Sequence, residues 1–230
     1  MFGDFRIFGS SHLAVLGLLF LFSLAIWFWL SKCPSRFQKY LKFALIGGLI
    51  LQLLAFNSWH FLHQTFDITR FLPFHLCTIS VYLIIYTLRF NNNFVNKLVL
   101  FWSPISAFVA ITLPDMSANE NFPSFRFVEF FGSHLLIIWS CVYILGVVKP
   151  KIEFKDCLIS FACLISVLPL VWGINYIFKS NYMYLMSRPA GGQTNFLTNE
   201  PWHVLGLIVI FGIVFFVEYL FYKTQNTNHN

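Results

Sequence analysis

The chain has 230 residues, of which 58% are hydrophobic and only 10% are charged. Soluble globular domains carry about 25% charged residues, so the composition excludes that class and predicts an integral membrane protein. The net charge of +6 is spread over short loops between apolar runs, a distribution that does not indicate a nucleic-acid partner.

A helix that crosses a bilayer needs about 20 mostly apolar residues, and seven runs of the chain meet this requirement. They lie at approximately 12–30, 43–62, 71–88, 94–113, 127–148, 157–178 and 202–222. Short polar turns separate the runs, and no shift in composition marks a second domain. We therefore predict an all-α fold, in which residues 1–230 form one integral membrane domain, a polytopic bundle of seven transmembrane helices.

Lysine and arginine are retained in cytoplasmic loops, and they are distributed unevenly between the two sides that the predicted spans define. One side carries ten of them: Lys32, Arg36, Lys39, Lys42, Arg89, Lys97, Lys149, Lys151, Lys155 and Lys223. The other side carries five: Arg6, Arg70, Arg126, Lys179 and Arg188. This asymmetry predicts that the N-terminus is outside and the C-terminus inside.

Six of the seven histidines fall in the outer half of the membrane or at its outer surface when the spans are threaded in this way. They are His12, His60, His63, His75, His134 and His203. The polar residues at the same level are Asn57, Asn175, Asn181, Tyr182 and Tyr184. A one-sided polar layer in a helical bundle predicts a cavity open to the outer leaflet. The alternative is that these histidines are interfacial residues without a further role.

His75 and His134 fall one to two turns inside the predicted third and fifth spans, where a solvated imidazole is not expected, and we predict that both are catalytic. Within one helix His75 shares a face with Thr78 but not with Cys77. A nucleophilic Cys77 therefore needs a base from another helix, and His134 is the candidate at similar depth. In the alternative readings Cys77 is a small core residue and Thr78 binds its own backbone.

Histidines near the outer face also raise the question of a zinc site. His60 and His63 are three residues apart and Asp67 follows them, but the stronger pattern of two histidines four apart with a nearby carboxylate is absent. The five cysteines lie mostly inside or beside apolar runs and form neither a zinc-ribbon pattern nor a disulfide framework. We expect no metal and no other cofactor, and a zinc hydrolase stays an alternative.

Several motifs, taken in order, resemble a known family over nearly the whole chain. They are the Phe-Gly-Ser-Ser-His opening that ends at His12, Leu72-Pro73-Phe74-His75-Leu76-Cys77, His134, Asn181-Tyr182-Met183-Tyr184-Leu185 with Arg188-Pro189, and Pro201-Trp202. In these residues the chain resembles the YwaF-type family of bacterial integral membrane proteins. That family is similar to transmembrane protein 164, a cysteine-dependent acyltransferase that remodels ether phospholipids. More remotely it is similar to the androgen-induced hydrolases of fatty acid esters.

The resemblance implies a multi-pass protein of the bacterial cell membrane that transfers or hydrolyses acyl esters of membrane lipids at the outer leaflet. By position, Phe74 stands where the relative has its nucleophilic cysteine, whereas both histidines are retained. Cys77 or Thr78 would then substitute as the nucleophile, with His75 or His134 as the base. Asn181 or Tyr182 would polarise the ester carbonyl.

Further expectations concern the substrate and the alternatives to an enzyme. The residues expected to bind substrate are His12, Asn175, Asn181, Tyr182 and Trp202. The expected partner is a membrane lipid and not a nucleic acid, and the oligomeric state is left open. The alternatives are a protein that binds or transports a lipid or small molecule without chemistry, and a ceramidase-like zinc hydrolase.

Overall fold

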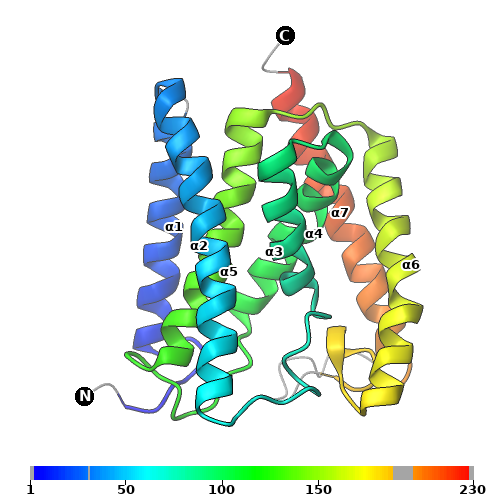
Figure 1. Cartoon of the computed structure of the whole chain (residues 1–230). Helices are drawn as coiled ribbons and strands as arrows, with labels where there is room; N and C mark the ends of the chain where they lie inside the picture. Colours follow the sequence, from blue (N-terminus) through cyan, green and yellow to red (C-terminus); the bar gives the residue numbers. More distant parts are fainter. Residues whose placement is uncertain (1–2, 31, 189–198, 228–230) are drawn as a thin grey trace. The chain divides into compact units, whose positions relative to one another are not determined.

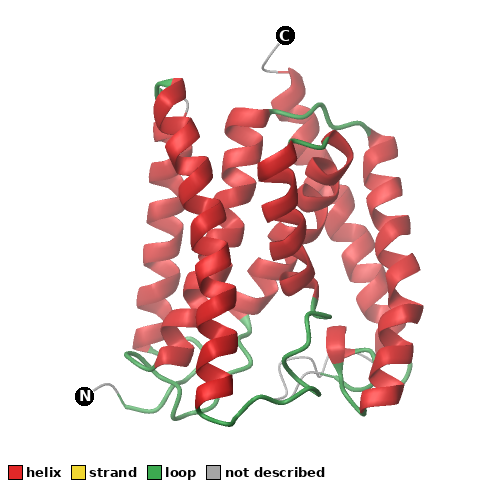
Figure 2. Cartoon of the chain, in the orientation of Figure 1, coloured by secondary structure: helices red, strands yellow, loops and turns green. Residues whose placement is uncertain are grey.

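The computed structural model describes residues 3–30, 32–188 and 199–227, and every regular element within these ranges is a helix (Figures 1 and 2). The helices are α1 (Ser10–Leu30), α2 (Ser35–Leu62), α3 (Leu76–Phe90), α4 (Asn93–Thr112), α5 (Phe125–Tyr143) with a π-helical end η1 (Ile144–Val148), α6 (Phe154–Phe178), the 3-10 helix η2 (Tyr182–Tyr184) and α7 (His203–Thr227). The all-α prediction is confirmed for these residues.

Among the residues that the structure describes, six helices are long and apolar enough to cross a membrane. They are α1, α2, α4, α5 continued by η1, α6 and α7. The helix α3 has only 15 residues, which at about 1.5 Å per residue is shorter than the hydrocarbon core of roughly 30 Å. The chain is thus a polytopic helical membrane protein, and the seventh crossing and the orientation stay predictions.

The start of α3 differs from the sequence prediction because the apolar residues before it form turns instead of a helix. The carbonyl of Asp67 accepts hydrogen bonds from the amides of Arg70 and Phe71, and the amide of Phe74 bonds to the carbonyl of Leu72. Pro73 in this segment has no amide hydrogen to donate. The helix therefore begins at Leu76, and not at residue 71 as predicted.

The first unit of the chain comprises Met1–Gln64 and Ser80–Pro150, and α5 packs against α1, α2 and α4 within it. Gly48 of α2 faces Leu136 of α5 so closely that a Cβ at this position would lie 3.2 Å from the leucine side chain. At one end of the unit, an aromatic and aliphatic cluster joins the N-terminal segment to α1, α4 and α5. Its buried members are Phe5, Leu19, Ile111, Phe127, Phe130 and Phe131.

The second unit comprises Thr65–Ile79 and Lys151–Asn230. Within it α6 packs against α7, and η2 packs against α6. Its buried cluster consists of Val171, Tyr182 and Leu185, and Leu72, Phe74 and Val204 are among the residues that pack against it. The apolar side chains that precede α3 are therefore used in the core of this unit.

Candidate functional site

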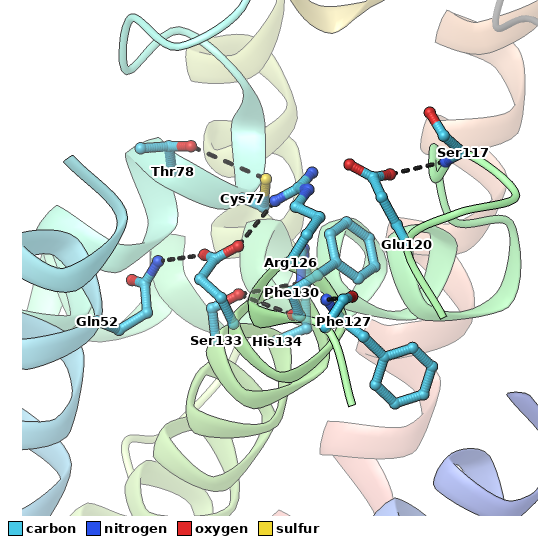
Figure 3. A network of polar contacts seen from close by, with 12 residues as sticks. Gln52, Cys77, Thr78, Ser117, Glu120, Arg126, Phe127, Phe130, Ser133 and His134 are labelled. Carbon is cyan, nitrogen blue, oxygen red and sulfur yellow. Dashed lines mark hydrogen bonds and ion pairs between the residues drawn. The ribbon is translucent and has the colours of Figure 1, made fainter. Parts of the chain in front are cut away.

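His134 lies in the third turn of α5, in the first unit, and is 5% exposed. Its Nδ1 is 2.7 Å from the carbonyl oxygen of Phe130, one turn earlier in the helix (Figure 3). A carbonyl only accepts, so Nδ1 carries the proton and donates it. The other ring nitrogen, Nε2, is buried and has no hydrogen-bond partner among the residues that the structure describes. His134 thus presents a bare basic nitrogen in a membrane-spanning helix.

Ser133 is the hydroxyl nearest to this imidazole along the chain. Its Oγ is 3.3 Å from Nδ1 of His134 and donates to the carbonyl of Phe130 at 2.8 Å. Because Nδ1 already carries the proton that it shares with the same carbonyl, it cannot take the proton of Ser133. The hydroxyl instead makes the backbone contact that is usual for serine within a helix.

A polar network in the first turns of α5 joins this helix to α2, and the predicted span began one residue after the Arg126 of this network. Nη1 of Arg126 and Nε2 of Gln52 each lie 2.8 Å from a carboxylate oxygen of Glu129, whose side chain is 6% exposed. The guanidinium also lies 5.0 Å from the ring centre of Phe130, which is itself 4.5 Å from the ring of His134. The helix starts early because Oγ of Ser124 caps it by accepting the amide hydrogen of Phe127.

His12, which the sequence suggests as a substrate-binding residue, is fully buried at the start of α1. Its Nδ1 accepts the amide hydrogen of Phe8 at 2.8 Å, and its Nε2 donates to the carbonyl of Ile111 at 2.7 Å. The rings of Phe5, Phe8 and Phe131 surround it. Both ring nitrogens therefore serve the fold by tying the N-terminal segment to α4, and a role in substrate binding stays a prediction.

Tyr182 is the centre of the second unit and is fully buried. Its hydroxyl donates to the carbonyl of Ile68 and accepts the amide hydrogen of Leu72 at 3.0 Å. Its backbone amide and carbonyl both bond to the side chain of Asn175 in α6, at 2.7 Å and 2.9 Å. Burial raises the pKa of the Tyr182 phenol. These contacts make Tyr182 and Asn175 the link between the two chain segments of this unit.

Asn181 holds the loop after α6 in place. Its amide nitrogen donates to the carbonyl and the hydroxyl of Ser187, and its amide oxygen accepts from the backbone amides of Met186 and Ser187. Asn175, Asn181 and the cations Arg70 and Lys179 line an open cavity of about 430 Å³. The other residues of its lining are Thr69, Tyr176, Ser180, Met186 and Ser187. The sequence had indicated the two asparagines but not the two cations.

His75 is the last residue before α3, in the second unit, and not one to two turns inside a helix as predicted. Its Nδ1 lies 3.5 Å from the amide nitrogen of Met183, and its ring packs edge-on against Tyr182 at 5.1 Å and tilted against Tyr184 at 5.9 Å. Since Nδ1 accepts a hydrogen bond, the proton of the neutral ring is on Nε2. His75 is therefore a donor at Nε2, whereas His134 is an acceptor there.

Cys77 and Thr78, the two candidate nucleophiles, lie in the first turn of α3 and are both half-buried. Their side chains contact each other, with Sγ 4.0 Å from Oγ1. A hydroxyl does not take the proton of a thiol, so this contact does not activate Cys77. The choice between the two nucleophiles stays a prediction.

Trp202, which the family motif suggests as a substrate-binding residue, lies directly before α7 and is 64% exposed. Its backbone amide bonds to the carbonyl of Asn199. An exposed indole at a helix end suits the membrane interface, and its part in substrate binding stays a prediction. Pro189 of the neighbouring motif lies outside the described residues.

His203 is the residue that sequence reasoning left among ordinary interfacial histidines. It is the first residue of α7, is fully buried, and donates from Nε2 to the carbonyl of Tyr184 at 2.9 Å. Its Nδ1 is buried and has no partner within the described ranges. The signal that could have found it is its position directly after Pro201-Trp202, one of the motifs that carry the family resemblance.

No three histidine, cysteine, aspartate or glutamate side chains come together as metal ligands in the part of the chain that the structure describes. The expected absence of a cofactor stays a prediction.

The helices and buried polar groups define the class of the protein as a multi-pass helical membrane protein. The model of the TMEM164 family matches residues 7–219. The chain therefore belongs to the TMEM164 family, which confirms the predicted relation to transmembrane protein 164. No curated protein and no solved structure shows significant similarity to the chain. The YwaF-type branch and the remote link to the androgen-induced hydrolases stay predictions.

Proposed function

We propose that the protein is a membrane enzyme that transfers or hydrolyses acyl chains of membrane lipids at the outer leaflet. The observation that carries the proposal is His134, a buried imidazole in a membrane-spanning helix. Its Nδ1 is held by the Phe130 carbonyl, and its Nε2 has no hydrogen-bond partner within the described ranges. Such a nitrogen is costly to leave unsatisfied, by about 1–3 kcal/mol. A general base needs this arrangement, with one nitrogen fixing the ring and the other open to a proton.

In the proposed reaction Nε2 of His134 takes a proton from the group that attacks the ester carbonyl, and returns it to the oxygen that leaves as the ester bond breaks. Cys77 and Thr78 stay the nucleophiles that the sequence predicts. The structure uses the amide of Asn181 and the hydroxyl of Tyr182 in loop contacts, so the polarisation of the ester carbonyl by either side chain stays a prediction.

The cavity of the second unit supports a phospholipid as the substrate. Arg70 and Lys179 supply two positive charges, and Thr69, Ser180 and Ser187 supply hydroxyl groups, in a space of about 430 Å³. Guanidinium and ammonium groups together with hydroxyls are the usual partners of a phosphate. Asn175 and Asn181, which the sequence indicated as substrate-binding residues, shape this cavity through their backbone contacts.

The experiment uses the full chain purified into lipid nanodiscs whose phospholipids carry isotope-labelled acyl chains, with mass spectrometry of acyl exchange and release. His134→Asn keeps an amide near the position of Nδ1, where it can bond to the Phe130 carbonyl, and removes Nε2. We expect turnover to fall by about 10²- to 10⁴-fold, the usual contribution of a general base, with the unfolding temperature nearly unchanged. His75→Ala should also lose turnover.

His63→Asn is the matched control. His63 bonds through Nδ1 to the carbonyl of Trp59, one turn earlier, at 2.8 Å, as His134 does to Phe130, but His63 is exposed. This variant should turn over lipid at the wild-type rate. Wild-type protein that binds or moves lipids while every acyl chain stays in place would contradict the proposal and favour a binding or transport protein.

A further inference from the structure

The turn Tyr182–Tyr184 has an unusual backbone. Met183 and Tyr184 are consecutive residues with positive φ, 55° and 54°, and neither is a glycine. Each such residue is strained and persists only where its surroundings hold it. Strained turns of this kind gather at sites where backbone groups must point in set directions.

The two strained residues direct their backbone groups to two different imidazoles of the second unit. The amide of Met183 points to Nδ1 of His75 at 3.5 Å, and the carbonyl of Tyr184 accepts from Nε2 of His203 at 2.9 Å. Both neutral rings therefore carry their proton on Nε2. The lone pair on Nδ1 of His75 accepts the amide hydrogen of Met183, and that of His203 has no partner among the described residues.

The bare nitrogen of His203 is not explained by the fold. The residue is fully buried, and no described residue donates to Nδ1. Buried polar atoms of native proteins nearly always have a partner, and an exception calls for an unseen water or a function. The bond to Tyr184 supplies the reason for a function, because a carbonyl that accepts from Nε2 also stabilises the imidazolium that forms when Nδ1 gains a proton.

We infer that Nδ1 of His203 is the base for the second half of the reaction and takes the proton of the hydroxyl that receives the acyl chain. This inference rests on the proposed function. As the O–H bond of the acceptor breaks, its proton moves to Nδ1, and the oxygen forms the new bond to the acyl carbonyl carbon. The bond from that carbon to the nucleophile that carried the acyl chain breaks, and this leaving group takes the proton from Nδ1, so no net proton is consumed.

The ligand class is therefore a hydroxyl compound. It is the free glycerol hydroxyl of a monoacyl phospholipid in acyl transfer, or water in ester hydrolysis. The two sources are separated by measuring transfer and release in nanodiscs with and without a monoacyl phospholipid.

Two variants of His203 test the basic nitrogen Nδ1 separately from the hydrogen bond between Nε2 and the Tyr184 carbonyl. The amide nitrogen of His203→Gln reaches the position of Nε2 and keeps the bond to the Tyr184 carbonyl, but the variant has no basic Nδ1. His203→Asn loses that bond as well. We expect both to lose 100-fold or more in the rate of acyl transfer, and only His203→Asn to lower the unfolding temperature. A His203→Gln variant that transfers acyl chains at the wild-type rate overturns the inference.

A second measurement does not depend on turnover. In wild-type protein labelled with ¹⁵N-histidine, the Nδ1 signal of His203 should shift when a monoacyl phospholipid with a free hydroxyl is added. The analogue with a methylated hydroxyl should leave the signal in place. An equal response to both lipids, or none to either, overturns the inference. A selective response in a protein that turns over no ester supports the hydroxyl site while it contradicts the proposed acyl chemistry.

Discussion

His12 and His203 are both fully buried imidazoles at the beginning of a membrane-spanning helix, one in each unit of the chain. At His12 both nitrogens are bonded, one to the amide of Phe8 and the other to the carbonyl of Ile111. At His203 Nε2 is bonded to Tyr184, and Nδ1 has no partner among the residues that the structure describes. Burial is thus the same at the two sites, and the difference lies in how many ring nitrogens the fold itself satisfies.

This difference distinguishes a histidine that only stabilises the fold from one that can take part in a reaction. An imidazole with two backbone partners adds hydrogen bonds that hold segments together and has no nitrogen left for a ligand. An imidazole with one backbone partner is oriented and still basic. By this criterion His134 resembles His203, although the two belong to separate units. His12 then serves as the internal reference for both.

Among the variants that test this comparison, His12→Ala should have the largest effect, and the effect is a loss of stability. The substitution removes one buried and one partly buried hydrogen bond and the packing of three aromatic rings. Together with the cavity left behind, we expect the free energy of unfolding to fall by about 2–4 kcal/mol. Unfolding in nanodiscs followed by tryptophan fluorescence measures it. A stable variant with a raised KM would instead make His12 a substrate-binding residue, as the sequence suggests.

The next effect concerns Glu129, whose partners are Arg126 and Gln52. In Glu129→Ala the guanidinium and the buried amide of Gln52 both lose their acceptor, and we expect a loss of about 1–3 kcal/mol. Glu129→Gln keeps one acceptor oxygen and should lose less. Comparison of the two variants by chemical unfolding tests whether charge or hydrogen bonding joins α2 to α5, and equal losses would assign the stabilisation to charge alone.

Much of the fold follows from the sequence, because in a bilayer the length of an apolar run largely decides whether a helix can cross. Six of the seven predicted runs correspond to helices long enough to span. The exception is the segment before α3. Phe71, Leu72 and Phe74 are apolar, but they form turns and the last two pack around Tyr182. Hydropathy cannot distinguish an apolar side chain that faces lipid from one that packs in a loop.

The candidate site residues were also predictable from the sequence only in part. The bond from His134 to the Phe130 carbonyl is local, four residues back in a helix. The bond that satisfies His12 comes from Ile111, 99 residues away, and that of His203 comes from Tyr184 through a strained turn. Sequence identifies the histidines, but which of their nitrogens are bare depends on contacts between distant segments. For that reason His203 was not among the predicted catalytic residues.

A smaller effect is expected from removing the hydroxyl of Tyr182, which lies at the centre of the second unit. Tyr182→Phe leaves the carbonyl of Ile68 and the amide of Leu72 without their partner, and we expect a loss of about 1–2 kcal/mol. Burial raises the pKa of the phenol in the folded protein. The stability that the neutral tyrosine contributes is therefore fully present below the unfolded pKa of about 10. It is lost as pH rises through the higher pKa of the folded protein. The phenylalanine variant should lack this alkaline loss in unfolding scans.

The smallest effect is expected at two lysines, one in each unit, that directly follow a helix and have a positive φ. Lys149 follows η1 with φ of 52°, Lys179 follows α6 with φ of 54°, and both side chains are exposed. Glycine adopts this conformation without the Cβ penalty, so Lys149→Gly should raise the free energy of unfolding by about 0.5–1 kcal/mol. Lys179→Gly should gain less, since the ammonium lies 4.7 Å from the ring centre of Tyr176 and that cation–π contact contributes about 0.5–1 kcal/mol. Thermal unfolding measures both. Equal gains would mean that the contact with Tyr176 adds nothing to stability, and the cation at position 179 would then be free to serve the cavity alone.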